Sequence, residues 1–216
     1  MFNTPEIIED RDVEYLKKEL LENGRIKLYP AAFFDSFDPV DLKVFCYKNA
    51  RYGLITKELV ECLKDLIKDR RAIEIGSGYG DLGYHLGIPM TDNKQQNWPE
   101  LRSYYAALGQ PIIDYPRDVV QMDALDAVLF YKPKVVVASW VTQWIDPDKP
   151  PTTPGNAWGI KEDEILKHVE CYAMLGNKKV HDSKFICSLP HRELSLPFLR
   201  SRSSDNGLDR VYIWGG

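Results

Sequence analysis

A short apolar run followed at once by alternating glycines constrains this chain more than any other feature. The run is Ala72-Ile73-Glu74-Ile75, and residues 76–83 read Gly-Ser-Gly-Tyr-Gly-Asp-Leu-Gly. Such a run fits a buried parallel strand, and glycine permits the backbone angles of the sharp turn that must follow it. The N–H groups at the start of the next helix add a weakly positive environment. The sequence therefore predicts a nucleotide-type binding turn.

Two glycine patterns overlap in this turn. Gly78, Gly80 and Gly83 satisfy the dinucleotide spacing G-x-G-x-x-G. The second pattern, E-x-G-x-G-x-G, begins at Glu74 and takes in Gly76 with two of the same glycines. A diphosphate gains nothing from a carboxylate at the strand end, whereas a ligand with an ammonium and a sulfonium does. The second pattern resembles motif I of the class I S-adenosylmethionine-dependent methyltransferases. A glycine-rich turn without a ligand is the structural alternative.

The segments around the turn alternate between helical and extended patterns. Residues 57–69 carry apolar side chains at helical spacing behind a Thr56 cap, and residues 134–140 form an apolar run typical of a central strand. Other strands are expected at 88–91, 119–122, 171–176, 184–189 and 210–214. Other helices are expected at 11–23, 82–86, 99–108, 124–131 and 161–170. This alternation predicts an α/β, doubly wound, mostly parallel seven-stranded sheet with an antiparallel last strand.

With 216 residues the chain can bury a full core and is most simply one domain with extensions. We expect a helical, aromatic-rich N-terminal extension over residues 1–54, with its aromatic residues in a loop. It would act as a lid over a substrate pocket or as a plug at the sheet edge, and the plug is favoured slightly. Residues 55–216 would form the Rossmann-like methyltransferase domain that the resemblance implies. A proline-rich insertion at 145–160 would lie on the substrate side.

Acidic residues follow the next two expected strands. Asp92 comes after the second strand, where a carboxylate can accept hydrogen bonds from both ribose hydroxyls. Asp123 and Ala124 follow the third, where the resemblance implies recognition of adenine by the carboxylate and the Ala124 N–H. Asp92 could instead be a loop residue, and Asp123 could cap a helix. With S-adenosylmethionine as the implied cofactor, the implied binding residues are Glu74, Gly76, Ser77, Gly78, Tyr79, Gly80, Asp92, Asp123 and Ala124.

The strand at 134–140 ends in Ser139 and Trp140, at the edge where a doubly wound sheet opens its ligand crevice. Methyl transfer is an in-line displacement that depends mainly on positioning and on exclusion of water. An aromatic face near the sulfonium would favour its charge by roughly 0.5–2 kcal/mol. A hydroxyl or protonated amine as acceptor would also need a base, for which His191 is best placed and His181 second. The candidate catalytic residues are therefore His191, Trp140 and Ser139.

Composition and short motifs limit the classes of binding partner and the cellular compartment that we expect. The 28 basic and 32 acidic residues give a formal net charge of −4 and a pI of about 5.6, which argues against a broad nucleic-acid footprint. Residues 139–142 read Ser-Trp-Val-Thr and lack the prolines of the [DNS]-P-P-[YFW] motif of enzymes that methylate adenine N6 or glutamine N5. The four cysteines lack metal-ligand spacing, no apolar run approaches the length of a membrane span, and the first residues lack a signal-peptide pattern. We expect reduced cysteines, no metal, no membrane contact and a cytoplasmic location.

The predicted function is methyl transfer from S-adenosylmethionine to a small molecule or a protein side chain. Two alternatives belong to other classes. An NAD(P)-dependent oxidoreductase would use Gly78, Gly80 and Gly83 together with Asp92. A non-catalytic S-adenosylmethionine-binding module would keep the glycine turn but would lack a pocket for an acceptor.

Overall fold

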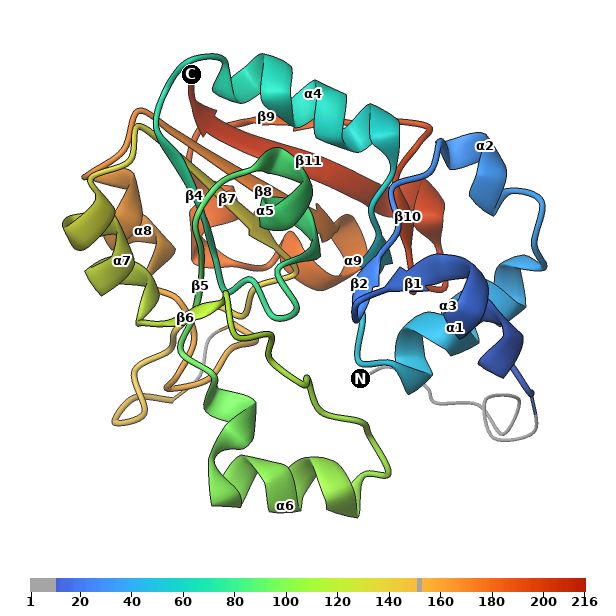
Figure 1. Ribbon diagram of the computed structural model, residues 1–216. Helices are drawn as coiled ribbons and strands as arrows, with labels where there is room; N and C mark the ends of the chain where they lie inside the picture. The colour runs from blue at the N-terminus through green and yellow to red at the C-terminus, as the bar shows by residue number, and fades with distance from the viewer. Residues whose placement is uncertain (1–10, 151–152) are drawn as a thin grey trace.

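The computed structural model describes residues 11–150 and 153–216. The start of the expected N-terminal extension (1–10) and the centre of the expected insertion (151–152) lie outside the described residues. A seven-stranded sheet forms the centre of the described chain, and helices cover both of its faces (Figure 1). The fold is α/β and Rossmann-like, as the sequence predicts.

The main sheet has the strand order β6-β5-β4-β7-β8-β11-β9. Its strands are β4 (Ala72–Ile75), β5 (Met90–Asp92), β6 (Val120–Gln121), β7 (Val135–Ser139), β8 (Cys171–Asn177), β9 (Arg192–Leu194) and β11 (Asp209–Gly215). The pairs from β6 to β8 are all parallel, while β11 is antiparallel to β8 and to β9. This confirms a mostly parallel sheet with an antiparallel last strand. The chain passes from β4 outward to β5 and β6, then returns to β7 on the other side of β4, so the strand order reverses between β4 and β7.

The sixth strand lies later in the chain than the sequence suggested. Residues 184–189, expected as a strand, contain the 3-10 helix η3 (Phe185–Ser188), and β9 follows it. Ile186 is buried, and its main-chain oxygen accepts a hydrogen bond from Trp214 Nε1 at 3.0 Å. The apolar run therefore packs against the sheet without joining it, and a short apolar run has no periodicity that separates these two outcomes.

Helices fill the intervals between the strands. They are α1 (Glu14–Leu20), α2 (Ala31–Phe34), α3 (Pro39–Lys48), α4 (Lys57–Ile67), α5 (Asp81–Leu86), α6 (Pro99–Ala107), α7 (Ala124–Tyr131), α8 (Glu162–Leu166), α9 (Lys178–His181), η2 (Gln95–Asn97) and η4 (Asn206–Leu208). Thr56 caps α4 as expected, because its Oγ1 accepts from Leu59 N at 3.2 Å. The helices expected at 11–23 and 161–170 are shorter in the structure. Among the described residues no helix has the length and hydropathy that crossing a bilayer requires.

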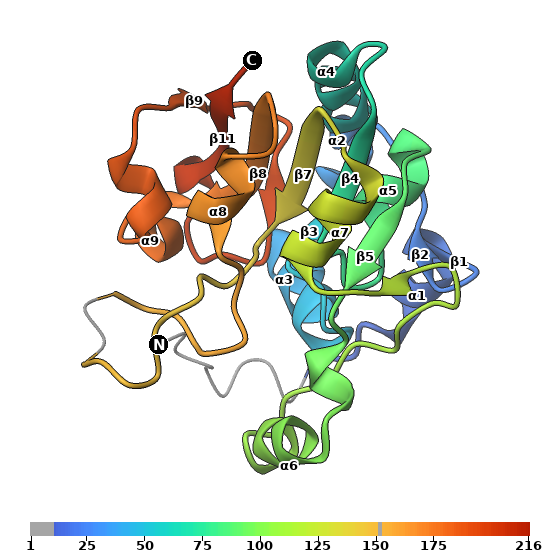
Figure 2. The same cartoon turned by 90° about the vertical axis from the view of Figure 1, so that its left-hand side faces the viewer.

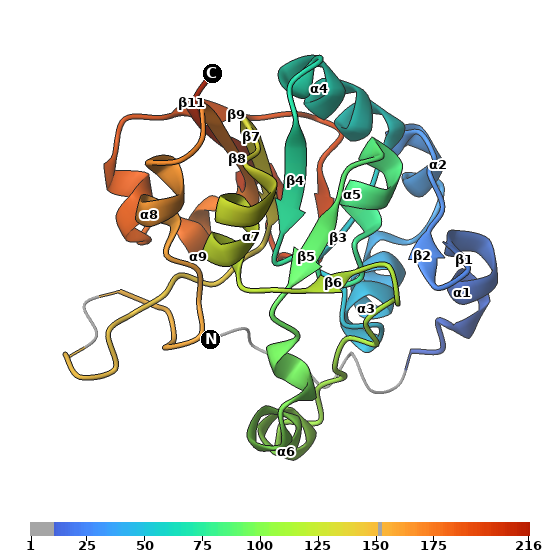
Figure 3. The ribbon, with the colours of Figure 1, turned by 60° about the vertical axis from the view of Figure 1, so that its left-hand side comes forward.

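Each face of the sheet has its own apolar core. Val135 and Val137 belong to the cluster that includes α4 and the N-terminal helices, whereas Val136 and Ala138 belong to the cluster that includes α7 and α8. Figures 2 and 3 show α7 and α8 together on one side of the sheet. Both faces of β7 are buried, which is why its sequence is continuously apolar rather than alternating.

The aromatic-rich stretch before α4 is helical, where a loop was expected. Asp38 caps α3 by accepting from Val40 N at 2.7 Å, and Pro39 occupies the first turn, where it needs no hydrogen-bond donor. Phe34 and Phe45 are fully buried in the α4-side cluster. Two short antiparallel ribbons complete this region: β1 (Leu21–Glu22) with β2 (Arg25–Ile26), and β3 (Gly53–Leu54) with β10 (Arg200–Ser201). The N-terminal segment is therefore part of the core on this face.

Candidate functional site

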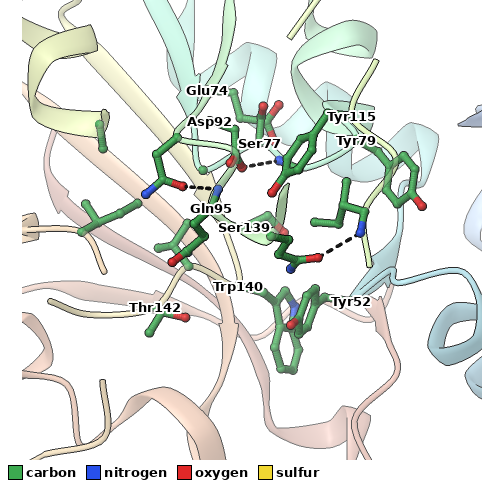
Figure 4. A pocket seen from close by; sticks show the side chains of 18 of the residues that line it. Tyr52, Glu74, Ser77, Tyr79, Asp92, Gln95, Tyr115, Ser139, Trp140 and Thr142 are labelled. Carbon is green, nitrogen blue, oxygen red and sulfur yellow. Dashed lines mark hydrogen bonds between the residues drawn. The ribbon is translucent and has the colours of Figure 1, made fainter. Parts of the chain in front are cut away.

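A pocket opens where β4, β5, β6 and β7 end, which is the edge that the topology predicts (Figure 4). Residues from the N-terminal segment, from the region around α6 and from the loop after β7 complete its walls. Gly80 and His191 are not among the residues that line it. The predicted site residues that do line it are Glu74, Gly76, Ser77, Gly78, Tyr79, Asp92, Asp123, Ala124, Ser139 and Trp140.

The glycine turn has two distinct requirements for glycine. Gly80 has φ +67°, and a Cβ there would lie 2.6 Å from Met90 Sδ, so this position serves packing. Gly78 has φ +55°, and a Cβ there would meet only the tip of Ile113, at 3.2 Å. Ser77 anchors the turn, because its N–H donates to Thr91 O at 3.0 Å. At Gly78, therefore, the main chain faces the pocket.

Asp92 is bound to this turn. Its Oδ2 accepts from Gly78 N at 2.9 Å and its Oδ1 from Lys94 N at 2.7 Å. Asp92 is buried, and burial raises the pKa of its carboxyl group, although these bonds and one from the Tyr115 hydroxyl act in the opposite direction. Figure 4 shows Tyr115 beside Asp92. A ligand hydroxyl at Asp92 would thus share the carboxylate with Tyr115 or replace its hydroxyl.

Glu74 serves the turn in a way that the sequence did not reveal. The side chain is 2% exposed, and its Oε2 accepts from Gly83 N at 2.8 Å. Burial raises the pKa of Glu74 to about 8; the bond from Gly83 lowers it, and the nearby Asp81 and Asp92 charges raise it. The carboxyl group therefore ties β4 to α5 while it also lines the pocket. A positive charge in the pocket would offset the cost of ionising it.

Two buried arginines of the N-terminal segment hold the turn, and neither was predicted from the sequence. Arg25 Nη1 donates to Tyr79 O and to Gly80 O, each at 2.7 Å. Arg51 pairs with Asp81, and its guanidinium lies 4.0 Å from the centre of the Tyr79 ring. These contacts join positions about 30 or 55 residues apart in sequence, so no local pattern could have indicated them.

Asp123 has the helix-capping role that was one of its two expected roles. Its Oδ1 accepts from Leu125 N at 2.9 Å at the start of α7. Asp123 and Ala124 also line the pocket, at the end of β6. A carboxylate has two oxygens, so the cap and a contact with a ligand amine are compatible.

Aromatic residues form the wall beside the β7 exit. Trp140 stacks on Tyr52, with ring centroids 5.7 Å apart, and Arg202 lies 4.0 Å above the Tyr52 ring. Trp140 has φ +56°, an unusual backbone conformation for a large side chain, and its N–H donates to Leu175 O at 2.9 Å. Strained backbone of this kind often occurs at functional sites, which is consistent with the position of Trp140 at the wall of the pocket. Ser139 and Trp140 lie together at the pocket, as the sequence predicts.

The structure brings neither candidate histidine to the pocket. The ring centroids of His191 and Trp214 are 5.2 Å apart. His191 Nδ1 lies 2.8 Å from Leu189 O, and Nε2 lies 3.4 Å from Glu193 Oε1. His181 is buried behind Trp140, with ring centroids 5.1 Å apart, and burial lowers its pKa to about 4. His191 is therefore not positioned to act as a base in this pocket, and the strand expected just before it is instead η3.

The described cysteines are all free, as expected. Within residues 11–150 and 153–216, no three His, Cys, Asp or Glu side chains are grouped so that they could hold a metal ion.

No protein-family model matches this chain, and no curated protein matches it. Among solved structures, the crystal structure of SMU.776, described as a candidate methyltransferase and complexed with SAH, is 11% identical with a TM-score of 0.32. The match covers 67% of this chain and 44% of that chain, so this chain spans less than half of its length. Thermoplasma acidophilum 1320 is 13% identical with a TM-score of 0.31, over 85% of this chain and 92% of that chain. Both similarities are distant.

Proposed function

We propose that this protein transfers a methyl group from S-adenosylmethionine to a small molecule or a protein side chain. The observation that carries the proposal is the hydrogen bond from Gly78 N to Asp92 Oδ2, at 2.9 Å. A turn that binds a diphosphate offers its main-chain N–H groups to phosphate oxygens. Here that N–H is committed to a carboxylate, which favours a ligand with hydroxyl groups and positive charge.

The charges around the turn support the same choice. Glu74, Asp81 and Asp92 line the pocket, and a cation bound there would favour the ionised forms of these carboxyl groups, whereas a diphosphate would oppose them. The two nearby arginines already have partners. Arg25 donates to main-chain oxygens and to Asp118, while Arg51 binds Asp81 and Gly24 O. A ligand with a sulfonium and an ammonium therefore suits this turn better than a dinucleotide does.

Three parts of the pocket support cofactor binding. Asp123 and Ala124 would hold the adenine and Asp92 would hold the ribose, and all three residues line the pocket. Ser77 Oγ is buried and has no hydrogen-bond partner among the described residues, so it is available to the ligand at the turn. When bound, S-adenosylmethionine supplies an electrophilic methyl group.

The chain's own contribution would be to position the acceptor and to exclude water. Ser139 and Trp140 lie at the end of β7, and Tyr52 stacks on Trp140 at the same pocket. Tyr105 and Trp158 line the pocket from the α6 side and from the loop after β7. Aromatic faces exclude water and favour the sulfonium charge until the methyl group leaves. No histidine is among the described residues that line the pocket, and an acceptor that is already nucleophilic would need no base.

Methyl transfer can be tested with S-adenosylmethionine labelled in its methyl group. The protein is incubated with the labelled cofactor and with separated metabolite and protein fractions of a cell extract. We expect label in at least one fraction with the wild type and none with Gly78→Val. Binding of S-adenosylhomocysteine without transfer to any fraction would favour the non-catalytic module. Binding of NADH in its place would favour the oxidoreductase.

A further inference from the structure

A second, smaller hollow adjoins the cofactor pocket. It shares Gly53, Ile55, Ser139 and Trp140 with that pocket. Its other lining residues come from β3, α4 and β8 and from the C-terminal part of the chain. They are Leu54, Leu59, Leu175, Gly176, Leu199, Arg200, Ser201, Asp209 and Arg210. The hollow is therefore mostly apolar, and it touches the residues next to which a methyl group would be delivered.

One lining residue, Asp209, has an unsatisfied oxygen. The side chain is 4% exposed. Its Oδ1 accepts from Asn177 Nδ2 at 2.7 Å and from Ser201 Oγ at 3.0 Å. Its Oδ2 is buried and has no hydrogen-bond partner in the described part of the chain. A buried carboxylate oxygen without a donor costs free energy, so a donor group bound in the hollow and bonded to this oxygen would be stabilised.

The topology places Asp209 on the ligand side of the sheet. β11 is antiparallel to β8, and its first residue Asp209 lies opposite Asn177, the last residue of β8. The parallel strands β7 and β8 end at this same edge. Asp209 therefore belongs to the edge that carries Ser139, although it lies 70 residues later in the sequence and comes from the start of a strand.

The two arginines that line the hollow have other acidic partners. Arg200 Nη2 lies 2.7 Å from Asp35 Oδ1, and Arg210 Nε lies 3.7 Å from Glu193 Oε2. Neither pairing involves Asp209. Burial raises the pKa of Asp209, while the bonds from Asn177 and Ser201 lower it. Asp209 thus brings a buried acceptor atom to a hollow whose walls are mostly apolar, and the hollow suits a short aliphatic group that ends in an N–H or O–H donor.

We propose that this hollow binds the part of the methyl acceptor that carries an amine or hydroxyl on a short aliphatic chain, with Asp209 Oδ2 accepting its hydrogen bond. This rests on the proposed methyl transfer, because Ser139 and Trp140 connect the hollow to the cofactor pocket. Asp209 is a binding residue for the acceptor in this account, and the apolar side chains of Leu175 and Leu199 contact the aliphatic part.

The test uses small probes in place of the unidentified acceptor. Ethylammonium chloride and ethanol carry donors, and sodium acetate carries only acceptors. Each is titrated into the full chain with leucine methyl groups labelled for NMR, with and without S-adenosylhomocysteine. We expect at least one donor probe to shift the Leu175 and Leu199 signals at a concentration at least about tenfold below that needed for acetate. The absence of any preference for donor probes would overturn the proposal.

Asp209→Asn replaces an oxygen with an amide at the same size, and we expect it to weaken donor-probe binding at least about tenfold. Asp205→Asn is the matched control, because Asp205 is exposed and bonds to Gly207 N, outside the hollow. Donor probes that bind Asp209→Asn as they bind the wild type would contradict the proposal. If Asp209→Asn does not fold, Leu199→Phe fills the hollow from its apolar side and should abolish the shift at Leu175.

The two proposals fail in distinguishable ways. Asp209 does not line the cofactor pocket, so Asp209→Asn should bind S-adenosylhomocysteine as the wild type does. If S-adenosylhomocysteine binds and donor probes do not, the acceptor hollow is wrong and the cofactor site stands. If donor probes bind and S-adenosylhomocysteine does not, the hollow binds donors, but the methyl-transfer role of both sites is wrong.

Discussion

Arg25 Nη1 donates a hydrogen bond to the main-chain oxygen of Gly80 at 2.7 Å, across 55 residues of sequence. The same nitrogen donates to Tyr79 O, and Arg25 is 6% exposed. These two oxygens belong to the turn after β4, so the hydrogen bonds from Arg25 fix the orientation of the turn's main chain at the pocket. The N-terminal segment therefore holds the candidate binding turn in place.

Replacing Arg25 by lysine should loosen this turn. An ammonium group has no planar fork, so it cannot maintain the contacts to both main-chain oxygens and to Asp118. We expect the free energy of unfolding to fall by about 1–3 kcal/mol and the affinity for S-adenosylhomocysteine to fall with it. Urea denaturation and calorimetric titration measure the two effects. In the control Arg70→Lys, which removes donors to Leu66 O and Ile67 O at the end of α4, affinity should stay unchanged. Equal affinity loss in both variants would argue against a specific role for Arg25.

Gly78→Val should abolish binding of S-adenosylhomocysteine, because it places a side chain where the main chain faces the pocket. Gly87→Val is a matched control, since Gly87 also has a positive φ, +71°, but a Cβ there has nothing within 4 Å. Both variants carry a β-branched residue in a strained conformation, so both should lose stability. Only Gly78→Val should lose binding by calorimetry. Wild-type affinity in Gly78→Val would show that the ligand does not lie against this turn.

Glu74 should make stability depend on pH in a defined direction. Its pKa is raised from 4.5 to about 8 in the folded chain, so between these values the folded state binds more protons than the unfolded state. The contribution of Glu74 to the free energy of unfolding therefore falls as pH rises through this window. Glu74→Gln removes the titration, and its amide oxygen can still accept from Gly83 N.

We expect Glu74→Gln to be more stable than the wild type by about 1 kcal/mol or more at pH 8.5, and the difference to shrink towards pH 5. Urea denaturation of both proteins at several pH values gives this comparison. A stability difference that is the same at pH 5 and pH 8.5 would mean that Glu74 has no raised pKa.

Asp123 should affect both stability and binding, and two substitutions separate the effects. Asp123→Ala removes the cap of α7 and should cost about 0.5–2 kcal/mol of stability. It should also weaken S-adenosylhomocysteine binding by roughly 1–3 kcal/mol if the carboxylate holds the adenine amine. Asp123→Ser keeps a capping oxygen on a shorter side chain, so stability should recover while affinity does not. Recovery of both would reduce Asp123 to a helix cap.

Local patterns predicted the elements whose stability is mainly local. The turn from Glu74 to Gly80, the Thr56 cap and the continuously apolar β7 each have a signature within a few residues, and each was placed correctly. The run at 184–189 failed because a buried 3-10 helix and a buried strand need the same apolar side chains over so short a length. His191 was expected beside the pocket because it follows this run, so that expectation failed with the strand.

The contacts that complete the site are long-range, which is why the sequence did not reveal them. Arg25 and Arg51 meet the glycine turn from the N-terminal segment. Asp209 reaches the same edge of the sheet at the start of an antiparallel strand. The rule that ligands lie at the carboxyl ends of strands therefore gave no indication of it. Residues that reach a site by such routes are identified only when the sheet order is known.

The most direct test of the central claim is calorimetric titration of the full chain with S-adenosylhomocysteine and, separately, with NADH. We predict one S-adenosylhomocysteine bound per chain, loss of that binding in Gly78→Val, and no binding of NADH. Binding of NADH at the glycine turn with no binding of S-adenosylhomocysteine would contradict it.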